Sequence, residues 1–354
     1  MKIVIASDAW HPQVNGVVRA LGTTVDLLRA RGHRIELITP DQYRTIPCPS
    51  YPEIRLALGC GREIALRLDM SGADAVHIAT EGPIGWAVRR WCLMRKVAFT
   101  TSFHTRFPDY VAKRTRLPAD WIWPVMRRFH GPAARVLVAT AALGNELAER
   151  GIANTHLWPL GVDLALFDPT TPPLAEMAEL PRPIQLYVGR VAVEKNLGAF
   201  LGCDTPGSKV VVGDGPDRVG LAGRYPQARF LGAMHGPKLA SAYTAADVFV
   251  FPSRTETFGL VSIEALACGT PVAAYPVAGP IDIIGARGTG RHGGRESIGA
   301  VDKDLVVAIR LALQGVPAAC IAEASHYTWD RCTDAFEAGL GPCAAPEATP
   351  ALAA

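Results

Sequence analysis

The feature that most constrains the fold of this chain is a repeated alternation of short apolar runs with amphipathic segments. Six β-rich runs in the first half predict strands, at residues 2–7, 34–39, 75–80, 97–102, 135–140 and 155–160. The segments between them have the apolar spacing of helices. Because parallel strands need crossover connections, this alternation favours a parallel sheet with helices on both faces.

The alternation is interrupted once, at residues 164–183. This stretch holds five prolines (Pro169, Pro172, Pro173, Pro181, Pro183) and is typical of a linker between domains. A second strand series follows, at residues 184–190, 209–214, 228–233, 247–253 and 271–276. The sequence therefore predicts an α/β protein with two doubly wound, Rossmann-like parallel-sheet domains that face each other across a cleft, residues 1–163 and 184–325.

Two stretches do not follow the alternation. Residues 286–297 (ARGTGRHGGRES) are rich in glycine and arginine, and we expect a mobile loop that orders on binding. The segment 341–354 (GPCAAPEATPALAA) is rich in alanine and proline, and we expect a disordered tail. Residues 326–340, between the two, predict a last helix.

The composition is that of an ordinary globular protein, with 354 residues of which 49% are hydrophobic and 19% charged. Eight cysteines are scattered without a C-x-x-C motif or a His/Cys metal spacing, so we interpret them as reduced thiols of a cytoplasmic protein and expect no metal and no cofactor. The opening MKIVIASD is too short for a signal peptide, and no run of eighteen apolar residues occurs. The net charge is +3, with the basic excess before residue 163; this is compatible with an anionic partner surface or with a solvated face.

The strongest chemical signal is FPSRTETFGLVSIEALACGTPV, which predicts a strand, a loop and a helix that ends at Gly269. Backbone N–H groups at the start of such a helix can bind a phosphate, and Phe258, Gly259 and Leu260 would supply them. Thr257, directly before them, is expected to contact the same phosphate-bearing ligand. Further along the same motif, Glu264 could accept two sugar hydroxyls, or it could be an exposed helical carboxylate. Glu256, in the loop, could face the same ligand or could cap the helix.

Two further motifs follow strands of the second half. In YVGRVAVEKN, Arg190 and Lys195 lie where a strand ends and suit the diphosphate of a nucleotide sugar; the alternative is a solvated pair of loop cations. In VVGDGPDR, Gly213 and Gly215 suit a tight turn under a nucleotide.

Two motifs follow strands of the first half. Gly16 in NGVVR would let the main chain approach a phosphate or sugar from the opposite wall of the cleft. The motif is not G-x-G-x-x-G, which counts against a nicotinamide-dependent dehydrogenase. His104 in TSFHTRFPDY follows a strand, so it faces the cleft as a catalytic residue or is a structural histidine.

Seven motifs, taken in their order along the chain, make it resemble glycosyltransferase family 4 from Met1 to about residue 340. They are NGVVR, SFHTRFPDY, PLGVDLALFDP, YVGRVAVEKN, VVGDGP, FLGAMH and FPSRTETFGLVSIEALACGTPVAAY. The resemblance implies a GT-B fold in which the last helix, 326–340, crosses back to the first domain. It also implies that Arg190 and Lys195 bind the diphosphate and that Glu264 holds the ribose.

The same resemblance implies roles for the remaining site residues. Glu256 matches the residue that reads hydroxyls of the transferred sugar, with Phe258, Gly259 and Leu260 adding backbone contacts. His104 matches a histidine near the reaction centre, and Gly16 matches the phosphate loop of the first domain. The residues beside the base are Gly232, Ala233 and Met234.

The implied reaction transfers a sugar with retention of anomeric configuration and without a divalent metal, and no D-x-D motif is placed to hold one. The leaving phosphate would take the acceptor's proton, so no pair of catalytic carboxylates is needed. A nucleotide-sugar epimerase is the alternative in another reaction class, but it needs a base at a sugar carbon. A non-catalytic nucleotide-binding module is a further alternative. A partnership with nucleic acid is not supported.

Within the family the chain looks most like the bacterial branch that glycosylates lipids, which includes sulfoquinovosyl-, glucosyl- and glucuronosyl-diacylglycerol synthases and related mannosyltransferases. This favours UDP-glucose or UDP-glucuronate as donor and diacylglycerol as acceptor, with GDP-mannose as the alternative donor.

Tryptophan and arginine are interleaved in two stretches, which favours a peripheral protein on the anionic inner face of the cytoplasmic membrane. The residues concerned are Trp86, Arg89, Arg90, Trp91, Trp121, Trp123, Arg127 and Arg128. Core tryptophans beside a solvated basic edge are the alternative; the oligomeric state is left open.

Overall fold

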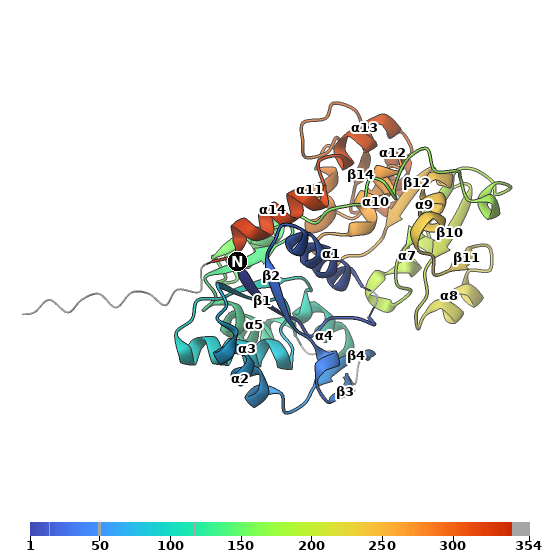
Figure 1. The fold of residues 1–354 in the computed structure, drawn as a ribbon. Helices are drawn as coiled ribbons and strands as arrows, with labels where there is room; N and C mark the ends of the chain where they lie inside the picture. Colours follow the sequence, from blue (N-terminus) through green and yellow to red (C-terminus); the bar gives the residue numbers. More distant parts are fainter. Residues whose placement is uncertain (14, 49–50, 116–117, 342–354) are drawn as a thin grey trace, which may run out of the picture.

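Two parallel sheets of six strands each form the framework of the computed structural model, which describes residues 1–13, 15–48, 51–115 and 118–341 (Figure 1). The N-terminal sheet has the strand order β2-β1-β5-β6-β7-β8, and all its neighbouring strands are parallel. Its strands are β1 (Lys2–Ala6), β2 (Arg34–Ile38), β5 (Ala75–Ile78), β6 (Thr100–Phe103), β7 (Arg135–Val138) and β8 (Thr155–Leu157).

Helices cover both faces of this sheet, because successive strand residues point to opposite sides and both sides are apolar. Ile3 and Ile5 pack with the side chains of α1, and Val4 packs on the other face with α2, α3 and α5. The helices are α1 (Gly16–Ala30), α2 (Gly61–Ser71), α3 (Pro83–Arg95), α4 (Phe107–Thr115), α5 (Trp123–His130) and α6 (Ala141–Glu149), with short 3₁₀ turns η1 (Pro40–Gln42) and η2 (Ala119–Trp121).

The C-terminal sheet repeats the plan with the order β11-β10-β9-β12-β13-β14. Leu186 and Val188 of β9 face one core, and Tyr187 between them faces the other. The strands are β9 (Ile184–Val188), β10 (Ser208–Val212), β11 (Arg229–Gly232), β12 (Val248–Phe251), β13 (Val272–Ala274) and β14 (Gly299–Val301). The connecting elements are η4 (Val193–Lys195), α7 (Leu197–Leu201), α8 (Arg218–Arg224), α9 (Gly236–Ala245), α10 (Leu260–Ala267), α11 (Ala278–Ile284), α12 (Leu305–Ala312) and α13 (Pro317–Ala324).

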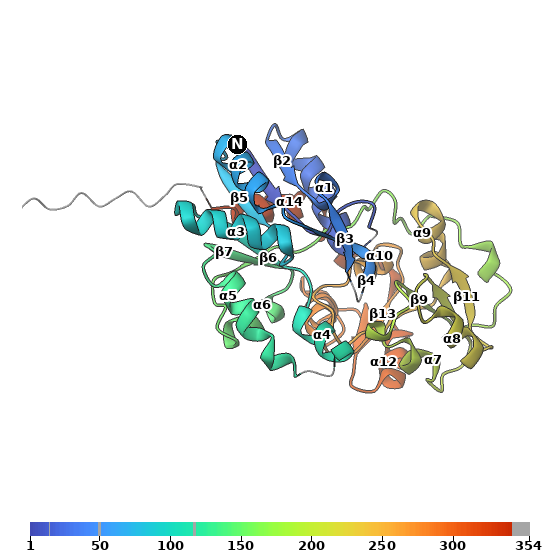
Figure 2. The ribbon, with the colours of Figure 1, turned by 90° about the horizontal axis from the view of Figure 1, so that it is seen from below.

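The chain passes between the two domains twice, and the two passages lie side by side. The first runs from β8 through η3 (Ala175–Met177), and the second precedes α14 (Trp329–Gly339). Val162 of the first donates its N–H to the carbonyl of Tyr327 in the second at 2.8 Å. The helix α14 then packs against α1, where Arg31 pairs with Glu337 at 2.6 Å. In both views α1 lies on the side of the N-terminal domain that faces the C-terminal domain (Figures 1 and 2).

The expected fold class is therefore confirmed, with two additions that the sequence pattern did not predict. One is a hairpin of β3 (Thr45–Cys48) and β4 (Tyr51–Ala57), and the other is the edge strand β14. The Gly/Arg-rich stretch 286–297 has a defined conformation, because the buried carboxylate of Glu323 accepts the N–H groups of Arg291 (3.1 Å) and His292 (3.3 Å).

Other expectations concern the cysteines, the tail and segments that could cross a membrane. The seven cysteines in the described ranges are all free, whereas Cys343 lies outside them. The tail that we expect to be disordered lies outside the described residues from position 342 onward. In the described ranges, no single helix has the length and apolarity to cross a membrane, whereas the bent pair α12–α13 passes that test of length and composition.

Candidate active site

The N-termini of two helices from different domains meet at the cleft, as the strand-end motifs lead us to expect. The side chain of Asn15 accepts the N–H of Val18 at 3.0 Å and so begins α1 at Gly16. A methyl group on Gly16 would lie 3.7 Å from the Leu260 side chain, which opens α10 on the opposite wall. Two positive helix ends therefore share one space, which suits an anionic ligand.

The loop before α10 has a conformation that only glycine adopts easily. Gly259 has a φ of 93°, and a Cβ there would lie 2.8 Å from the ring of Phe251. It is the N-cap of α10, and no side chain caps the helix. The neighbouring Thr257 donates its hydroxyl to the carbonyl of His104 at 2.7 Å, which ties this loop to the N-terminal domain.

Glu256, the first glutamate of the pair, lies in a loop that is bonded to the loop carrying Lys195. Glu256 is paired with the ammonium of Lys195 in η4, and both side chains are mostly buried. Asn196, in the left-handed conformation that asparagine tolerates, donates its side-chain amide to the carbonyl of Pro252 at 3.1 Å. The Lys195 loop and the Glu256 loop are thus held together, and the helix-capping alternative for Glu256 is wrong.

The second glutamate is buried between the domains. The side chain of Glu264 is 2% exposed, so the alternative of an exposed helical carboxylate is wrong. One of its oxygens accepts the Tyr243 hydroxyl at 2.9 Å, and the other is paired with the guanidinium of Arg19 from α1. Burial, with the adjacent carboxylate charge, raises the pKa of Tyr243 well above its usual value, so it stays a donor. Arg19 is a site residue that sequence reasoning missed, although it closes the NGVVR motif.

Buried polar atoms without partners gather around this loop. In the described part of the chain five buried side-chain polar atoms have no hydrogen-bond partner, and three of them are hydroxyls of Ser253, Thr255 and Ser262. A fourth is Nε2 of His104, and only Trp123 Nε1 belongs elsewhere. Buried polar groups are normally satisfied, so this cluster indicates a site that a polar ligand completes.

His104 is held in its neutral form. Its ring packs edge-on against Trp158 with centroids 5.3 Å apart. Burial, and next the charge of His130, lowers the pKa of His104 to about 4. At neutral pH the imidazole therefore offers one donor and one acceptor nitrogen without a positive charge.

The remaining predicted residues lie at strand ends of the C-terminal domain. Arg190 follows β9 and is partly buried. A Cβ on Gly213, at the end of β10, would come within 1.8 Å of the Gly189 carbonyl, so only glycine fits there. At the end of β11, Gly232 is partly buried, Ala233 is exposed and Met234 is buried. Nowhere among the described residues do three His, Cys, Asp or Glu side chains cluster as metal ligands would.

The polar groups on the N-terminal wall are mostly satisfied by the protein itself. Asp8, after β1, accepts the N–H groups of Ile84 (2.9 Å) and Gly85 (3.1 Å) at the start of α3. Burial is the main cause that raises the pKa of Asp8 to about 6. His77 contacts the hydroxyls of Thr100 (2.9 Å) and Ser102 (2.8 Å). These two side chains are therefore satisfied inside the domain and stabilise the fold.

The prediction of membrane-contact residues needs correction at three positions. Trp91 is buried and donates its indole N–H to Asp69 at 3.0 Å, and Trp123 is buried against the ring of Phe103. Arg89 is buried because its guanidinium binds main-chain carbonyls at the end of α5, including that of Phe129 at 3.0 Å. The other residues keep surface positions: Trp86 is partly buried, and Arg90, Trp121, Arg127 and Arg128 are exposed.

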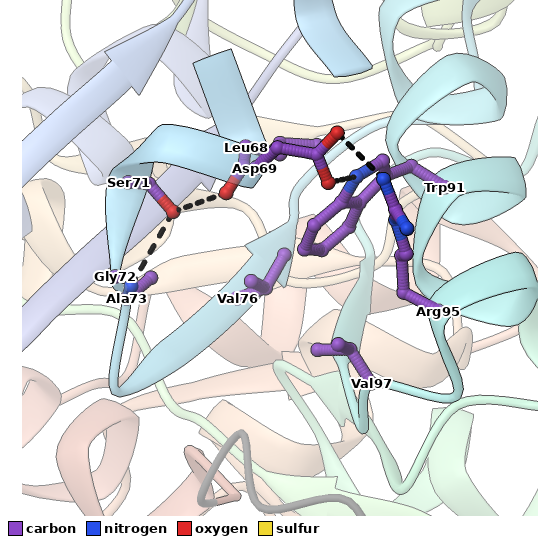
Figure 3. Close-up of a pocket in the computed structure, with 9 residues that line it drawn as sticks. All are labelled: Leu68, Asp69, Ser71, Gly72, Ala73, Val76, Trp91, Arg95 and Val97. Atoms are coloured by element: carbon purple, nitrogen blue, oxygen red, sulfur yellow. Dashed lines mark hydrogen bonds and ion pairs between the residues drawn. The ribbon is translucent and has the colours of Figure 1, made fainter. Parts of the chain in front are cut away.

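A surface pocket lies away from this site, between α2 and α3 (Figure 3). Its polar groups are paired with one another: Asp69 accepts Trp91 and Arg95, and the Ser71 hydroxyl donates to the Leu68 carbonyl at 2.8 Å. Among the predicted site residues only Trp91 lines it. We therefore place the functional site at the cleft.

Two parallel-sheet domains face each other across the cleft, where Glu256 is paired with Lys195 and Glu264 is buried between the domains. This architecture is that of a GT-B glycosyltransferase. Two family models match the chain, "Glycosyltransferase Family 4" over residues 14–166 and "Glycosyl transferases group 1" over residues 182–293. The chain belongs to glycosyltransferase family 4 and is a hexosyltransferase.

Curated relatives share most of the chain. A GDP-mannose-dependent alpha-mannosyltransferase from Mycobacterium tuberculosis is 32% identical over 82% of this chain and 83% of its own length. A sulfoquinovosyl transferase from Arabidopsis thaliana is 29% identical over 90% of this chain and 69% of its own. An alpha-monoglucosyldiacylglycerol synthase from Streptococcus pneumoniae is 26% identical over 78% and 71%. The resemblance to the glycolipid-forming branch is thereby confirmed.

Solved structures show the same fold at lower identity. A sucrose-phosphate synthase from Thermosynechococcus elongatus superimposes with a TM-score of 0.73 and 21% identity, covering 95% of this chain and 97% of that one. Anabaena HepE in complex with UDP has a TM-score of 0.66 and 15% identity, covering 96% and 99%.

Proposed function

We propose that this chain transfers a hexose or hexuronic acid from a nucleotide-diphosphate sugar to a lipid acceptor, with retention of configuration and without a divalent metal. The observation that carries the proposal is the set of buried, unpartnered hydroxyls and His104 Nε2 beside the Glu256–Lys195 pair and Glu264. A hydroxyl-rich, anionic ligand would satisfy this set, because it offers donors and acceptors together with negative charge.

The chemistry follows from where the charges lie. The bond between the anomeric carbon and the diphosphate oxygen breaks while the acceptor oxygen bonds to the same face of that carbon. The acceptor's proton passes to the departing phosphate. Arg190, Lys195 and the start of α10 would stabilise the charge on the leaving diphosphate, and the neutral His104 would contact the transferred sugar. In this scheme no side chain need act as a general base.

Two classes of donor are candidates. We favour UDP-glucose or UDP-glucuronate, in keeping with the glycolipid branch to which the chain is similar. GDP-mannose is a second candidate because the mannosyltransferases from Mycobacterium tuberculosis and Mycolicibacterium smegmatis, at 32% and 33% identity, are named for that donor. A nucleotide-sugar epimerase is disfavoured by the family assignment.

A lipid acceptor and a peripheral position on the anionic inner face of the cytoplasmic membrane fit the surface near α3 and α5. Trp121 is 70% exposed and Met94 is 63% exposed, and Leu93 and Val125 are exposed as well. Arg90, Arg127 and Arg128 are exposed on the same two helices. Apolar side chains beside arginines suit the interface of an anionic membrane.

The test is turnover of UDP-glucose, UDP-glucuronate and GDP-mannose with diacylglycerol in mixed micelles containing EDTA, with lipid products read by mass spectrometry and the anomer by NMR. A hexosyl- or hexuronosyl-lipid of the donor's own configuration is expected. Lys195→Ala serves as the inactive control, and Lys238→Ala, which removes a surface pair with Glu176, serves as the active one.

Each contrary result removes a defined part of the proposal. Activity that disappears with EDTA and returns with a divalent cation would overturn metal independence. Donor cleavage without a lipid product would overturn the lipid acceptor and leave soluble glycans as the candidates. Inversion at the anomeric carbon would overturn the front-face route.

A further inference from the structure

The ion pair between Arg19 and Glu264 joins residues of different domains at the centre of the site. Arg19 lies in the second turn of α1, three positions after Gly16, and its guanidinium contacts a carboxylate oxygen of Glu264 on α10. The guanidinium also lies over the ring of Phe167, 5.5 Å from its centroid, in the passage between the domains. Arg19 thus occupies a position at which the two domains and their connection meet.

The two partners differ in their freedom to move. Glu264 is 2% exposed and is anchored through its second oxygen by the Tyr243 hydroxyl at 2.9 Å. Arg19 is 37% exposed, on a long side chain that reaches in from the opposite wall. An incoming ligand that competes for the carboxylate would therefore displace Arg19 and leave Glu264 in place.

We propose that Arg19 is a latch that competes with the nucleotide's ribose for Glu264, so that it sets the affinity for the donor. This inference rests on the proposed function, in which Glu264 accepts the ribose hydroxyls. A buried carboxylate without a partner is costly, so in the ligand-free protein the guanidinium supplies the compensating charge. When ribose hydroxyls donate to the same oxygen, the guanidinium leaves, and its lost ion pair reduces the net free energy of binding.

The latch also couples donor binding to the contact between the domains. Other contacts across the cleft involve different groups: Thr257 donates to the His104 carbonyl, and Asp282 accepts the N–H of Ala142 at 3.0 Å. These can persist when Arg19 is released. Nucleotide binding would thus remove one specific tie between the domains and retain others.

The test is calorimetric titration of UDP and, separately, GDP into the full chain at pH 7. The variants are Arg19→Ala, Arg19→Lys, Glu264→Ala and the double variant of Arg19→Ala with Glu264→Ala. The control is Arg29→Ala on the same helix, whose exposed side chain pairs with exposed Asp26 at 3.6 Å. Melting temperatures establish that each variant is folded.

We expect Arg19→Ala to lower the Kd of the nucleotide that the wild type binds by about fivefold or more, because the unpaired Glu264 no longer loses a partner on binding. Arg19→Lys should give a smaller decrease in Kd, since an ammonium lacks the planar fork of arginine. In the Glu264→Ala background, Arg19→Ala should leave the Kd within about twofold, because the competition is already gone. Arg29→Ala should match the wild type.

An unchanged or raised Kd in Arg19→Ala, or an equal effect in the Glu264→Ala background, would overturn the latch while leaving the proposed function intact. If Arg19→Ala does not fold, the same decision rests on Arg19→Lys. If the wild-type protein binds neither UDP nor GDP, the proposed function fails, and the latch fails with it.

Discussion

The two walls of the cleft differ in how their polar groups are satisfied. On the C-terminal wall, the segment from Ser253 to Ser262, which comprises the loop before α10 and the first turn of that helix, buries three hydroxyls without partners. The same wall carries Glu256, paired with Lys195, and Glu264, paired with Arg19. On the N-terminal wall, Asp8 and His77 have their partners inside the domain. In the described part of this wall, Nε2 of His104 is the exception, because it is buried without a hydrogen-bond partner.

This difference suggests a division of labour. The C-terminal wall has buried, unpartnered polar atoms with which a sugar nucleotide would form hydrogen bonds. In the N-terminal domain, the buried polar atoms of Asp8 and His77 already have partners. A largely apolar acceptor such as a lipid needs few polar contacts, so the contrast agrees with the proposed function.

The largest effect should come from Lys195→Ala on the C-terminal wall. Loss of the ammonium that we place on the leaving diphosphate should lower kcat by about a hundredfold or more, with a smaller change in KM. Steady-state kinetics with the preferred donor would measure this, with Lys238→Ala as control. A kcat within a factor of about three of wild type would mean that this wall does not stabilise the leaving group.

Removal of the second glutamate should act on binding. Glu264→Ala should raise the donor KM about thirtyfold, which corresponds to about 2 kcal/mol of lost hydrogen bonding to a charged group. The matched control is Glu176→Ala, which removes an exposed carboxylate paired with Lys238 at 2.9 Å. If kcat fell and KM stayed constant, Glu264 would act in the transition state and not in nucleotide binding.

On the N-terminal wall, His104 leads us to predict how the stability of the protein depends on pH. The pKa of His104 is about 4 in the folded protein, below the unfolded value near 6.5. Between these two pH values the unfolded chain binds a proton at His104 that the folded chain does not bind. The stability that this contributes is present above pH 6.5 and is lost as the pH falls toward 4. His104→Gln should therefore lose less stability than wild type between pH 7 and pH 5, by at most about 2 kcal/mol.

Denaturant unfolding at the two pH values would measure this difference, with His235→Gln, on an exposed histidine, as control. Parallel behaviour of wild type and His104→Gln would show that His104 titrates normally and is open to water. Nε2 of His104 would then be satisfied by water and would no longer be an unsatisfied polar atom of the N-terminal wall.

We expect the smallest effect from a substitution at the exposed surface around Trp121, outside the cleft. Trp121→Ala should weaken binding to vesicles with anionic headgroups about fivefold, because it removes an exposed indole, and should change stability by less than about 0.5 kcal/mol. Co-sedimentation would measure it, with Val219→Ala as a control at an exposed apolar residue of α8. Equal losses in both variants would argue against a dedicated membrane surface.

Much of the fold could be predicted because its signals are local. Continuous apolar runs predicted the strands, since a strand buried on both faces needs apolar residues at every position. The edge strand β14 escaped prediction because it has only three residues, Gly299–Val301, one of them a glycine, and follows the Gly/Arg-rich stretch 286–297. The candidate site was predictable where it depends on strand ends and on Gly259, whose φ of 93° excludes a side chain.

The sequence by itself thus determined the two sheets, the cleft between them and the residue types at its edge, because period and turn chemistry are properties of neighbouring residues. Only the tertiary structure decided that Arg19 meets Glu264, 245 positions away, since that contact depends on how two separately folded sheets face each other. It also decided that Trp123 is buried against Phe103 while Trp121, two positions earlier, is exposed. Burial depends on what packs against a residue, and that partner lies elsewhere in the chain.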